Sequence, residues 1–517
     1  TAETSGWRVA CQATRIPVAM ASEKLSAVIT RFGRRSFAEL NANANRLARL
    51  LRNYGLVPGD AVAIVSKNRP EFVETVLATA RSGIRITPIN FHLTADEIGY
   101  IVDDCEAKVF IADATLLEAV LGASKHAPRL KLCLAVGGEL TGFDDYADAI
   151  GALDGTDLAD PVLGNRMLYT SGTTGRPKGV YKEPFPEVVV WRETVSKYRA
   201  GEDCQLVTGP AYHAAPLLID VLGALNSGVG IVMMNGWDAE ETLRLIQEHR
   251  VTHTHMVPTM FHRLIRLPEE IRNRYDISSL RCVVHGAAPC PVHLKHAMID
   301  WLGPVLWEYY GATEGSGGFF VGSEEWLTKP GTVGKPGPDY DNRILDAAGN
   351  ELPPGEVGTI YMRAPKQGRF RYFKDENKTT GSYHGDHFTL GDMGYFDKDG
   401  YLFLTGRSAE LIISGGVNIY PQEVDAELLK HEVVADACTF GVPNEEWGEE
   451  VRALVQLQPT VAQSSELTDA LMAWCRARLA GYKCPRHIEY RDELPRSAAG
   501  KIQRKEIRAN YLSSISD

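Results

Sequence analysis

The sequence predicts an α/β protein with a large N-terminal domain and a small α+β C-terminal domain. The chain has 517 residues, which exceeds the length of one ordinary domain. Short β-branched runs alternate with helical stretches, as in parallel sheets joined by crossover helices. The pattern of predicted strands and helices then changes near residue 331 and again after Arg407. We therefore expect an N-terminal domain over residues 1–408 and a C-terminal domain over residues 409–517.

The N-terminal domain is expected to contain two α/β layers. The first series of elements starts near residue 60 with the strand DAVAIVS, the helix PEFVETVLATARSG, the strand IRITPIN, the helix TADEIGYIVDD and the strand KVFIAD. The second contains the strand QLVTGP, the helix AEETLRLIQEHR, the strand VTHTHMVP, the segment SLRCVVHGAAP and a helix from Val292 to Trp301. Both series have the order of βαβ units, so each predicts a mostly parallel sheet.

The last third of the chain predicts two further units. Between residues 331 and 407, GNELPPGEVGTIYMRAP and FDKDGYLFLTGR carry clusters of Pro, Gly and Asp that mark hairpins, so this part is expected to be β-rich. After Arg407 come the strand LIISGG, a helix beginning near Pro421, strands around CTFGVP and VRALVQLQP, and a helix from Leu467 to Leu479. This order predicts a separate small α+β domain.

Composition excludes several classes of partner. The formal net charge of -11 argues against a general nucleic-acid surface, because such a surface needs clustered positive charge. The most apolar long stretch, from Leu217 to Trp237, is interrupted by Asp220, Asn226 and several glycines, so no stable membrane insertion is expected. The nine cysteines form no CxxC pair, which favours a reduced, cytoplasmic setting over a zinc site or a disulfide framework.

One loop has the composition of a phosphate-binding loop. It follows an apolar strand end in the run from Met167 to Val180, MLYTSGTTGRPKGV. Glycines let backbone N–H groups approach an anion, hydroxyls add donors and a lysine adds a charge. It is not a Walker loop, because GxxxxGK[ST] is not met. The predicted phosphate-binding residues are Thr170, Ser171, Gly172, Thr173, Thr174, Gly175 and Lys178.

The run YTSGTTGRPKG resembles the signature loop of the adenylate-forming superfamily, which contains acyl-CoA synthetases, carrier-loading adenylation domains and luciferases. The resemblance continues to Arg504 in the family's order. It implies that a turn containing Gly286, Ala287 and Ala288 contacts adenine, and that the segment after it lines the same site. The residues of that segment are Tyr309, Tyr310, Gly311, Ala312, Thr313 and Glu314, with Thr313 near the α-phosphate and Glu314 on magnesium.

The same resemblance implies the remaining roles. Asp392 would bind both ribose hydroxyls, Arg407 would help to hold the nucleotide, and Lys501 would contact the α-phosphate and the attacking carboxylate. His213 in PAYHAAPL resembles the aromatic gate near the acyl carbonyl. Thr170, His213, Glu314 and Lys501 are therefore the predicted catalytic residues. A glycine-bearing loop with Gly415, Gly416 and Asn418 would line the tunnel for coenzyme A.

Together these motifs imply the superfamily fold, in which two α/β subdomains and a distorted β-barrel precede a mobile C-terminal domain. They also imply an acyl-CoA ligase that uses ATP, Mg²⁺ and coenzyme A, with a homodimer as the expected assembly. Apolar residues from Ala214 to Gly223 and from Met256 to Phe261 indicate a hydrophobic carboxylic acid, and fatty, aromatic, steroid and terpenoid acids remain open, with a bulky lipid-like acid favoured. Cations for the phosphates of coenzyme A are expected among Lys483, Arg486 and Arg504.

One residue departs from the family pattern. The hinge usually has Asp or Lys two residues after the arginine, and this chain has Ala409. A shift of about 1.4 kcal/mol between domain poses changes their ratio tenfold, so an enzyme specialised for thioesterification of a pre-formed acyl-adenylate is one alternative. A carrier-loading adenylation enzyme is another, although PAYHAAPL lacks an aspartate to pair with an α-amino group. A non-catalytic nucleotide-binding sensor is a third.

Overall fold

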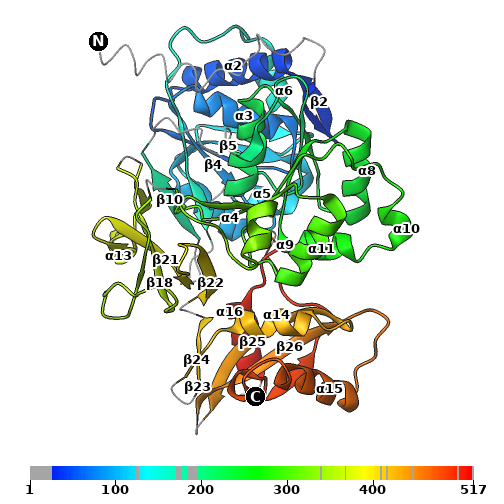
Figure 1. The fold of residues 1–517 in the computed structure, drawn as a ribbon. Coiled ribbons are helices and arrows are strands. Elements are labelled where there is room, and N and C mark those ends of the chain that lie inside the picture. The colour runs from blue at the N-terminus through cyan, green and yellow to red at the C-terminus, as the bar shows by residue number, and fades with distance from the viewer. Residues whose placement is uncertain are drawn as a thin grey trace.

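The computed structural model describes residues 26–123, 127–170, 177–183, 195–337, 340–366, 368–407, 410–414, 417–444, 447–497 and 500–514. A large body formed by the N-terminal part stands next to a small C-terminal one (Figure 1). Helices α9 (Pro258–Ile265) and α11 (Val292–Leu302) of the large body lie towards α14 (Pro421–Leu429) and α16 (Arg504–Ser514) of the small one. The junction between the two bodies is where the predicted site residues gather.

The first α/β layer is a sheet in the order β7-β6-β5-β3-β4-β8 with parallel pairing throughout. Every residue of β3 and β4 is buried, because helices cover both faces. Helices α2, α3 and α6 pack on one face and α4 and α5 on the other. The bounds are β3 (Ala61–Val65), β4 (Arg85–Ile89), β5 (Ala107–Asp113), β6 (Leu132–Val136), β7 (Asp144–Asp145), β8 (Asn165–Arg166), α2 (Phe37–Asn53), α3 (Pro70–Ala80), α4 (Ala95–Asp104), α5 (Leu117–Ala123) and α6 (Tyr146–Gly151).

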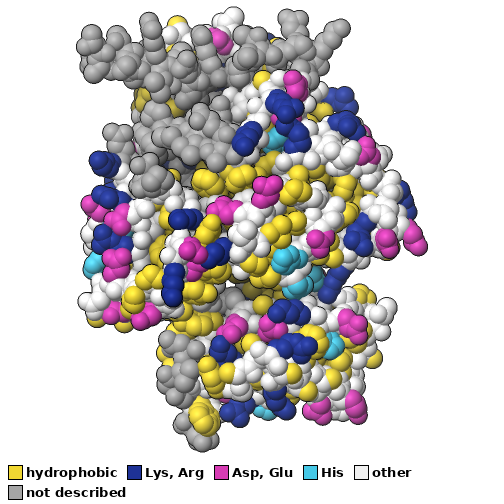
Figure 2. Space-filling view, viewed as in Figure 1, with side chains coloured by type: hydrophobic (Ala, Val, Ile, Leu, Met, Phe, Trp, Pro, Cys, Tyr) yellow, Lys and Arg dark blue, Asp and Glu magenta, His cyan; other side chains and the backbone are white. Residues whose placement is uncertain are grey.

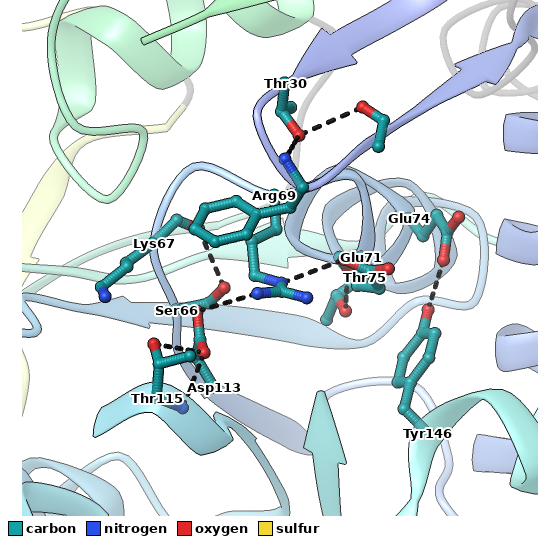
Figure 3. Close-up of polar contacts among 12 residues, drawn as sticks. Thr30, Ser66, Lys67, Arg69, Glu71, Glu74, Thr75, Asp113, Thr115 and Tyr146 are labelled. Atoms are coloured by element: carbon teal, nitrogen blue, oxygen red, sulfur yellow. Dashed lines mark hydrogen bonds and ion pairs between the residues drawn. The ribbon is translucent and has the colours of Figure 1, made fainter. Parts of the chain in front are cut away.

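A buried polar cluster ties this layer together (Figure 3). Arg69, which precedes α3, makes ion pairs with Glu71 at 3.3 Å and with Asp113 at the end of β5 at 3.7 Å. The Tyr146 hydroxyl of α6 donates to Glu74 at 2.9 Å. Buried charges are tolerated when they are paired in this way, so the cluster fixes α3 between the sheet and α6.

The second α/β layer is a sheet in the order β16-β15-β14-β13-β11-β12-β1-β2. Its inner strands are parallel, and β2 and β16 run antiparallel at the two edges. The carboxyl ends of parallel strands form the usual ligand-binding edge of such a sheet. The strands are β1 (Ser26–Thr30), β2 (Gly33–Ser36), β11 (Cys204–Val207), β12 (Gly230–Met233), β13 (His253–Met256), β14 (Cys282–His285), β15 (Leu306–Tyr310) and β16 (Phe319–Gly322).

Helices cover this second sheet on both faces. Helices α8, α9, α11 and α12 share a core with β13, β14 and β15 on one face. A π-helix over Pro216–Leu222 packs against β11 and β13 on the opposite face. The remaining helices of this region are α7 (Gly223–Leu225), α8 (Ala239–His249), α10 (Glu269–Arg272) and α12 (Ser323–Thr328).

The β-rich part forms a half-barrel from two small sheets. One has the order β19-β10-β9, and the other has the order β17-β18-β21-β20 with β22 paired to β21. The antiparallel pair of β10 and β19 brings the strand after the predicted phosphate loop next to residue 372. The bounds are β9 (Leu168–Thr170), β10 (Lys178–Lys182), β17 (Arg343–Leu345), β18 (Gly358–Arg363), β19 (Phe370–Tyr372), β20 (Tyr383–His384), β21 (His387–Phe396), β22 (Leu402–Arg407) and α13 (Glu376–Gly381).

The small C-terminal body has its own sheet and core. The sheet has the order β24-β23-β26-β25 with β27 on β26, and α14 and α15 (Ser465–Arg476) pack into one core with it. The Ser464 side chain caps α15 by accepting from the Leu467 backbone N–H, so this helix begins two residues before the predicted start. The strands are β23 (Ile412–Ser414), β24 (Val417–Ile419), β25 (Val434–Asn444), β26 (Gly448–Leu457) and β27 (His487–Tyr490). The predicted domain boundary at 408/409 lies outside the described residues.

In the part of the chain that the structure describes, no helix is both long and apolar enough to cross a bilayer.

Candidate active site

A carboxylate held by two partners marks the half-barrel side of the site. Asp392 on β21 lies opposite Arg407 on β22, and Arg407 Nε donates to Asp392 Oδ1 at 2.9 Å. The Tyr310 hydroxyl, at the end of β15, donates to Asp392 Oδ2 at 2.7 Å. Burial, followed by the charge of Asp392, holds the pKa of Tyr310 well above its usual value, so this phenol stays a donor. Both carboxylate oxygens are fixed in direction and retain lone pairs that suit a vicinal diol.

The second carboxylate, Glu314, lies among cationic side chains. The Tyr372 hydroxyl of β19 donates to Glu314 Oε1 at 2.8 Å, and Lys378 Nζ lies 3.9 Å from the centre of the Tyr372 ring. Burial and the charge of Arg166 lower the pKa of Lys182 to about 8, while Glu314 raises it. These lysine and arginine side chains carry more positive charge than the single Glu314 carboxylate balances, so the place suits an anionic ligand. Sequence reasoning missed Tyr372, Lys378 and Lys182, because only the pairing of β10 with β19 brings them to Glu314.

Lys501 comes to the same place from the C-terminal body. Its loop is closed by Arg496 Nη1, which donates to the Gly500 carbonyl at 2.6 Å, and by Ser497 N, which donates to the Lys501 carbonyl at 2.8 Å. Gly500 has φ +75°, and a Cβ there would lie 2.8 Å from Oγ1 of Thr259 in α9. Only glycine therefore allows this loop to lie so close to the large domain.

The charges around Lys501 locate it in the junction between the domains, which is hollowed on the face shown in Figure 2. Burial and the charge of Arg407 lower the pKa of Lys501, whereas Asp392 and Glu314 raise it. The Lys501 side chain is exposed to solvent, and the charges that act on it are those of Arg407, Asp392 and Glu314. The structure thus brings the predicted residues Lys501, Asp392, Arg407 and Glu314 together.

His213 completes the group on the side of the π-helix. Burial, and then the charges of Lys501 and His92, lower the pKa of His213 to about 4, so the imidazole is neutral near pH 7. Its ring lies 4.5 Å from the ring of Tyr212. Among the described residues, neither His213 Nε2 nor the Tyr212 hydroxyl has a hydrogen-bond partner, although both atoms are buried. Buried polar atoms of this kind are uncommon, and these two could each form a hydrogen bond with a ligand.

The turn after β14 is shaped by close packing. A Cβ at Gly286 would lie 2.5 Å from Cε1 of Tyr309, so the ring of this tyrosine lies directly against the turn. Ala287 has φ +67°, a conformation that costs a residue with a Cβ roughly 1–2 kcal/mol. Ala288 and Gly311 are partly buried and Ala312 is exposed, and Thr313 is partly buried beside Glu314. The first turn is therefore shaped by its contact with Tyr309, and the second turn stays partly exposed beside Glu314.

The two tyrosines of β15 point to opposite faces of the sheet, as alternation in a strand requires. Tyr310 reaches Asp392, whereas the Tyr309 hydroxyl lies 3.4 Å from Nε2 of His255 in β13. The sequence assigned both to the nucleotide. Tyr310 contacts the carboxylate assigned to the ribose, whereas Tyr309 lies against the turn of Gly286, so its role at the nucleotide stays a prediction.

The predicted phosphate loop is described only at its two ends. Thr170 and Lys178 face each other in the pair of β9 and β10, and Lys178 Nζ lies 2.7 Å from Asp375 Oδ2, a partner that the sequence did not suggest. Ser171, Gly172, Thr173, Thr174 and Gly175 lie outside the described residues, as do the hinge residue Ala409 and the tunnel residues Gly415 and Gly416. The backbone of Asn418 pairs with Ile413 in the β23–β24 hairpin.

Two expectations are wrong. Arg504 was nominated for the phosphates of coenzyme A, but it is 6% exposed and its Nε donates to the Thr439 carbonyl at 2.7 Å inside the small body. The range from Met256 to Phe261 was expected to line the pocket, but its two end residues are 2% and 0% exposed in the core beneath α8, α9 and α11, while Val257, Thr259 and Met260 are partly buried. The spacing of apolar residues along the sequence does not reveal which face of a helix or strand other elements cover.

Comparison with known proteins bears directly on this arrangement. The family model described as AMP-binding enzyme matches residues 18–370, and the model of the AMP-binding enzyme C-terminal domain matches residues 423–501. The chain belongs to the AMP-binding enzyme family. Feruloyl-CoA synthase from Amycolatopsis sp is 34% identical over 484 residues, which cover 92% of this chain and 94% of that protein. The 2-succinylbenzoate–CoA ligase of Geobacillus kaustophilus is 34% identical, with 92% and 93% covered.

Solved structures agree with this AMP-binding enzyme fold. ATP-bound MatB from Rhodopseudomonas palustris superposes with a TM-score of 0.83 at 26% identity, covering 97% of this chain and 99% of that one. The anthranilate CoA ligase AuaEII in complex with anthranoyl-AMP has a TM-score of 0.87 at 24% identity, with 98% of each chain covered, which shows likeness of fold. The chain is an AMP-forming acid–thiol ligase of the acyl-CoA synthetase branch.

Proposed function

We propose that this AMP-binding enzyme activates a hydrophobic carboxylic acid as its acyl-adenylate and then transfers the acyl group to coenzyme A. The observation that carries the proposal is the convergence of Lys501 on Asp392, Arg407 and Glu314, since the lysine comes from a separate domain. A cation and two oriented carboxylates at one junction match the needs of a nucleotide whose α-phosphate is attacked.

In the first step, an oxygen of the acid attacks the α-phosphorus of ATP and the bond to the pyrophosphate oxygen breaks. Negative charge grows on the phosphate oxygens, and Lys501 would neutralise it while Asp392 holds the ribose hydroxyls. Lys182 and Lys378, which both lie close to Glu314, would neutralise the negative charge of the leaving pyrophosphate. In the second step, the thiol of coenzyme A gives its proton to water and attacks the acyl carbonyl, so that the carbon–sulfur bond forms as the bond from the acyl carbon to the phosphate oxygen of AMP breaks.

A magnesium ion fits the residues around Glu314. Among the described residues, no group of three or more His, Cys, Asp or Glu side chains gathers in a way that could hold a metal. Mg²⁺ often binds through one or two carboxylates and the phosphates of its nucleotide, so Glu314 alone meets that need. Its carboxylate is oriented by Tyr372 at 2.8 Å. When bound, the ion would supply charge neutralisation for the phosphates.

The hydrophobic character of the acid is supported from two sides. Ala214, Leu218 and Leu222 are partly buried apolar side chains that follow His213 along the π-helix region. Three relatives are at least 30% identical in sequence over 92% of this chain. They are named feruloyl-CoA synthase, 2-succinylbenzoate–CoA ligase and indoleacetate–CoA ligase. Aromatic acids are therefore the first class to test, with fatty acids next.

Acid-dependent exchange of labelled pyrophosphate into ATP, measured without coenzyme A, tests the first step. The Lys501→Met variant should lose this exchange by at least about 100-fold, because the cation acts in the transition state. It should still bind ATP, since Asp392, Arg407 and Glu314 remain. Lys398→Met, in the exposed turn between β21 and β22, is the matched control and should behave like the wild type. Equal exchange in the Lys501 variant and the wild type would refute the proposed role.

An enzyme specialised for thioesterification is a second proposal, carried by Ala409 alone. Such an enzyme would convert a supplied acyl-adenylate to the thioester quickly while its pyrophosphate exchange stays slow. Measuring the rates of adenylation and of thioester formation with one acid separates the two proposals. A ligase that performs the whole reaction should show comparable rates for both steps.

A further inference from the structure

Three polar side chains, those of Asp220, His255 and Tyr309, form a hydrogen-bonded relay that ends beside the turn of Gly286. Asp220 Oδ2 lies 3.2 Å from His255 Nδ1, and the Tyr309 hydroxyl lies 3.4 Å from His255 Nε2. Asp220 is 1% exposed and His255 is 4% exposed, whereas Tyr309 is only partly buried. The tyrosine is thus the member of this relay that can touch a ligand.

The fold brings the three residues together from distant parts of the sequence. His255 is on β13 and Tyr309 on β15, and both face the side of the sheet that the π-helix covers. Asp220 is inside that π-helix, and Gln205 Nε2 of β11 donates to its other oxygen at 3.2 Å. Helices of the π type are rare and occur often at functional sites. The π-helix also follows His213, so the relay and the gate residue belong to one wall.

The chemistry of the relay sets the direction of its hydrogen bonds. A carboxylate only accepts, so Asp220 favours the His255 tautomer with its proton on Nδ1. His255 Nε2 then accepts, and the Tyr309 hydroxyl donates to it. A hydroxyl oxygen has two lone pairs, so a tyrosine hydroxyl that donates to His255 can also accept a hydrogen bond. The nearby charge of Asp220 disfavours an anionic group there.

We propose that the Tyr309 hydroxyl, oriented by His255 and Asp220, is a specificity-determining group that accepts a hydrogen bond from a hydroxyl or amino substituent on the acid, remote from its carboxylate. This rests on the proposed function, because it identifies the class of acid that the ligase activates. The substrate is then a largely apolar acid with a neutral donor at its far end. Asp220 and His255 act as positioning residues.

A purely structural role for the relay makes a different prediction. If the three residues only brace the π-helix against the sheet, their loss changes the handling of all acids equally. A recognition role instead changes the ratio between acids that carry the donor and matched acids that lack it. A site built to bond a substrate hydroxyl rejects the analogue without it.

The test compares matched acids in the wild type, in Tyr309→Phe and in Asp220→Asn. The probes are cinnamic acid and 4-hydroxycinnamic acid, benzoic acid and its hydroxy and amino isomers, and decanoic and 10-hydroxydecanoic acid. The wild type should favour the best donor-bearing acid over its plain counterpart by about 5- to 150-fold in kcat/KM, the range of one hydrogen bond to a buried group. Tyr309→Phe should bring that ratio near one, because it lowers kcat/KM for the donor-bearing acid more than kcat/KM for the plain acid.

Asp220→Asn keeps the shape of the relay and should reduce the same ratio in part. Tyr146→Phe, which removes a buried hydroxyl bond to Glu74 far from this site, is the matched control and should leave the ratio intact. No preference in the wild type, or a preference that survives Tyr309→Phe, overturns the proposal. If Tyr309→Phe does not fold, the ratio in Asp220→Asn decides.

Titration calorimetry of the same acids, with a non-hydrolysable ATP analogue present, separates this inference from the proposed function. A binding preference that disappears in Tyr309→Phe supports the relay even if no acyl-adenylate forms, in which case the proposed ligase activity alone is wrong. Equal binding of the matched acids refutes the relay whether or not the enzyme turns over.

Discussion

Arg504 is a buried cation that stabilises the small C-terminal body and is not placed to bind coenzyme A. Its guanidinium is buried in the small body, where Nη1 donates to Glu410 at 3.1 Å, Nε donates to the Thr439 carbonyl and Nη2 bonds to Asp425. Asp425 is 8% exposed, and burial raises its pKa while Arg504 lowers it. Removing the arginine leaves a buried carboxylate without its cation, which costs about 3–5 kcal/mol. Arg504→Met should therefore destabilise the small body by that amount.

Hydrogen exchange of β25 and α14 in the full-length enzyme measures this loss, because it reports the local free energy of opening. The control is Arg508→Met on the same helix, where the side chain is 41% exposed and pairs with Glu449, so a cost below about 1 kcal/mol is expected. The KM for coenzyme A should stay unchanged in the folded Arg504 variant. Unchanged exchange together with a raised KM would show that Arg504 binds the cofactor instead and would refute the reasoning.

Three further outcomes are expected. Tyr372→Phe frees Glu314 from its 2.8 Å partner and should raise the KM for MgATP about 3- to 10-fold in the exchange assay, while Tyr383→Phe should not. The pKa of His213 is lowered to about 4, so the unfolded chain binds the proton first as the pH falls. Folding stability should then decline by up to about 3 kcal/mol between pH 6.5 and 4, and His213→Gln should flatten this part of the denaturation profile. Ala409→Asp should speed pyrophosphate exchange relative to thioester formation if the hinge limits adenylation, and equal half-reactions in both forms would exclude that limit.

The sequence alone determined the layer architecture and predicted the residues of the candidate active site. Alternation of β-branched runs with amphipathic helices is a local property, and it correctly predicted the two sheets and helices such as Val292–Trp301, found as Val292–Leu302. Asp392, Arg407, Glu314 and Lys501 each lie in a motif whose residue types carry their own chemistry. Their motifs could be recognised without knowing any distance between them.

The tertiary structure decided which side chains face which partner. Arg504 and Phe261 proved to be buried because other elements cover them, and coverage is not written in local spacing. Tyr372 reaches Glu314 only because β19 pairs with β10. The chain from Asp220 through His255 to Tyr309 joins a helix and two strands that are not neighbours in the sheet. Hydrogen bonds act over about 3 Å, so contacts between residues far apart in sequence exist only once packing has set their positions.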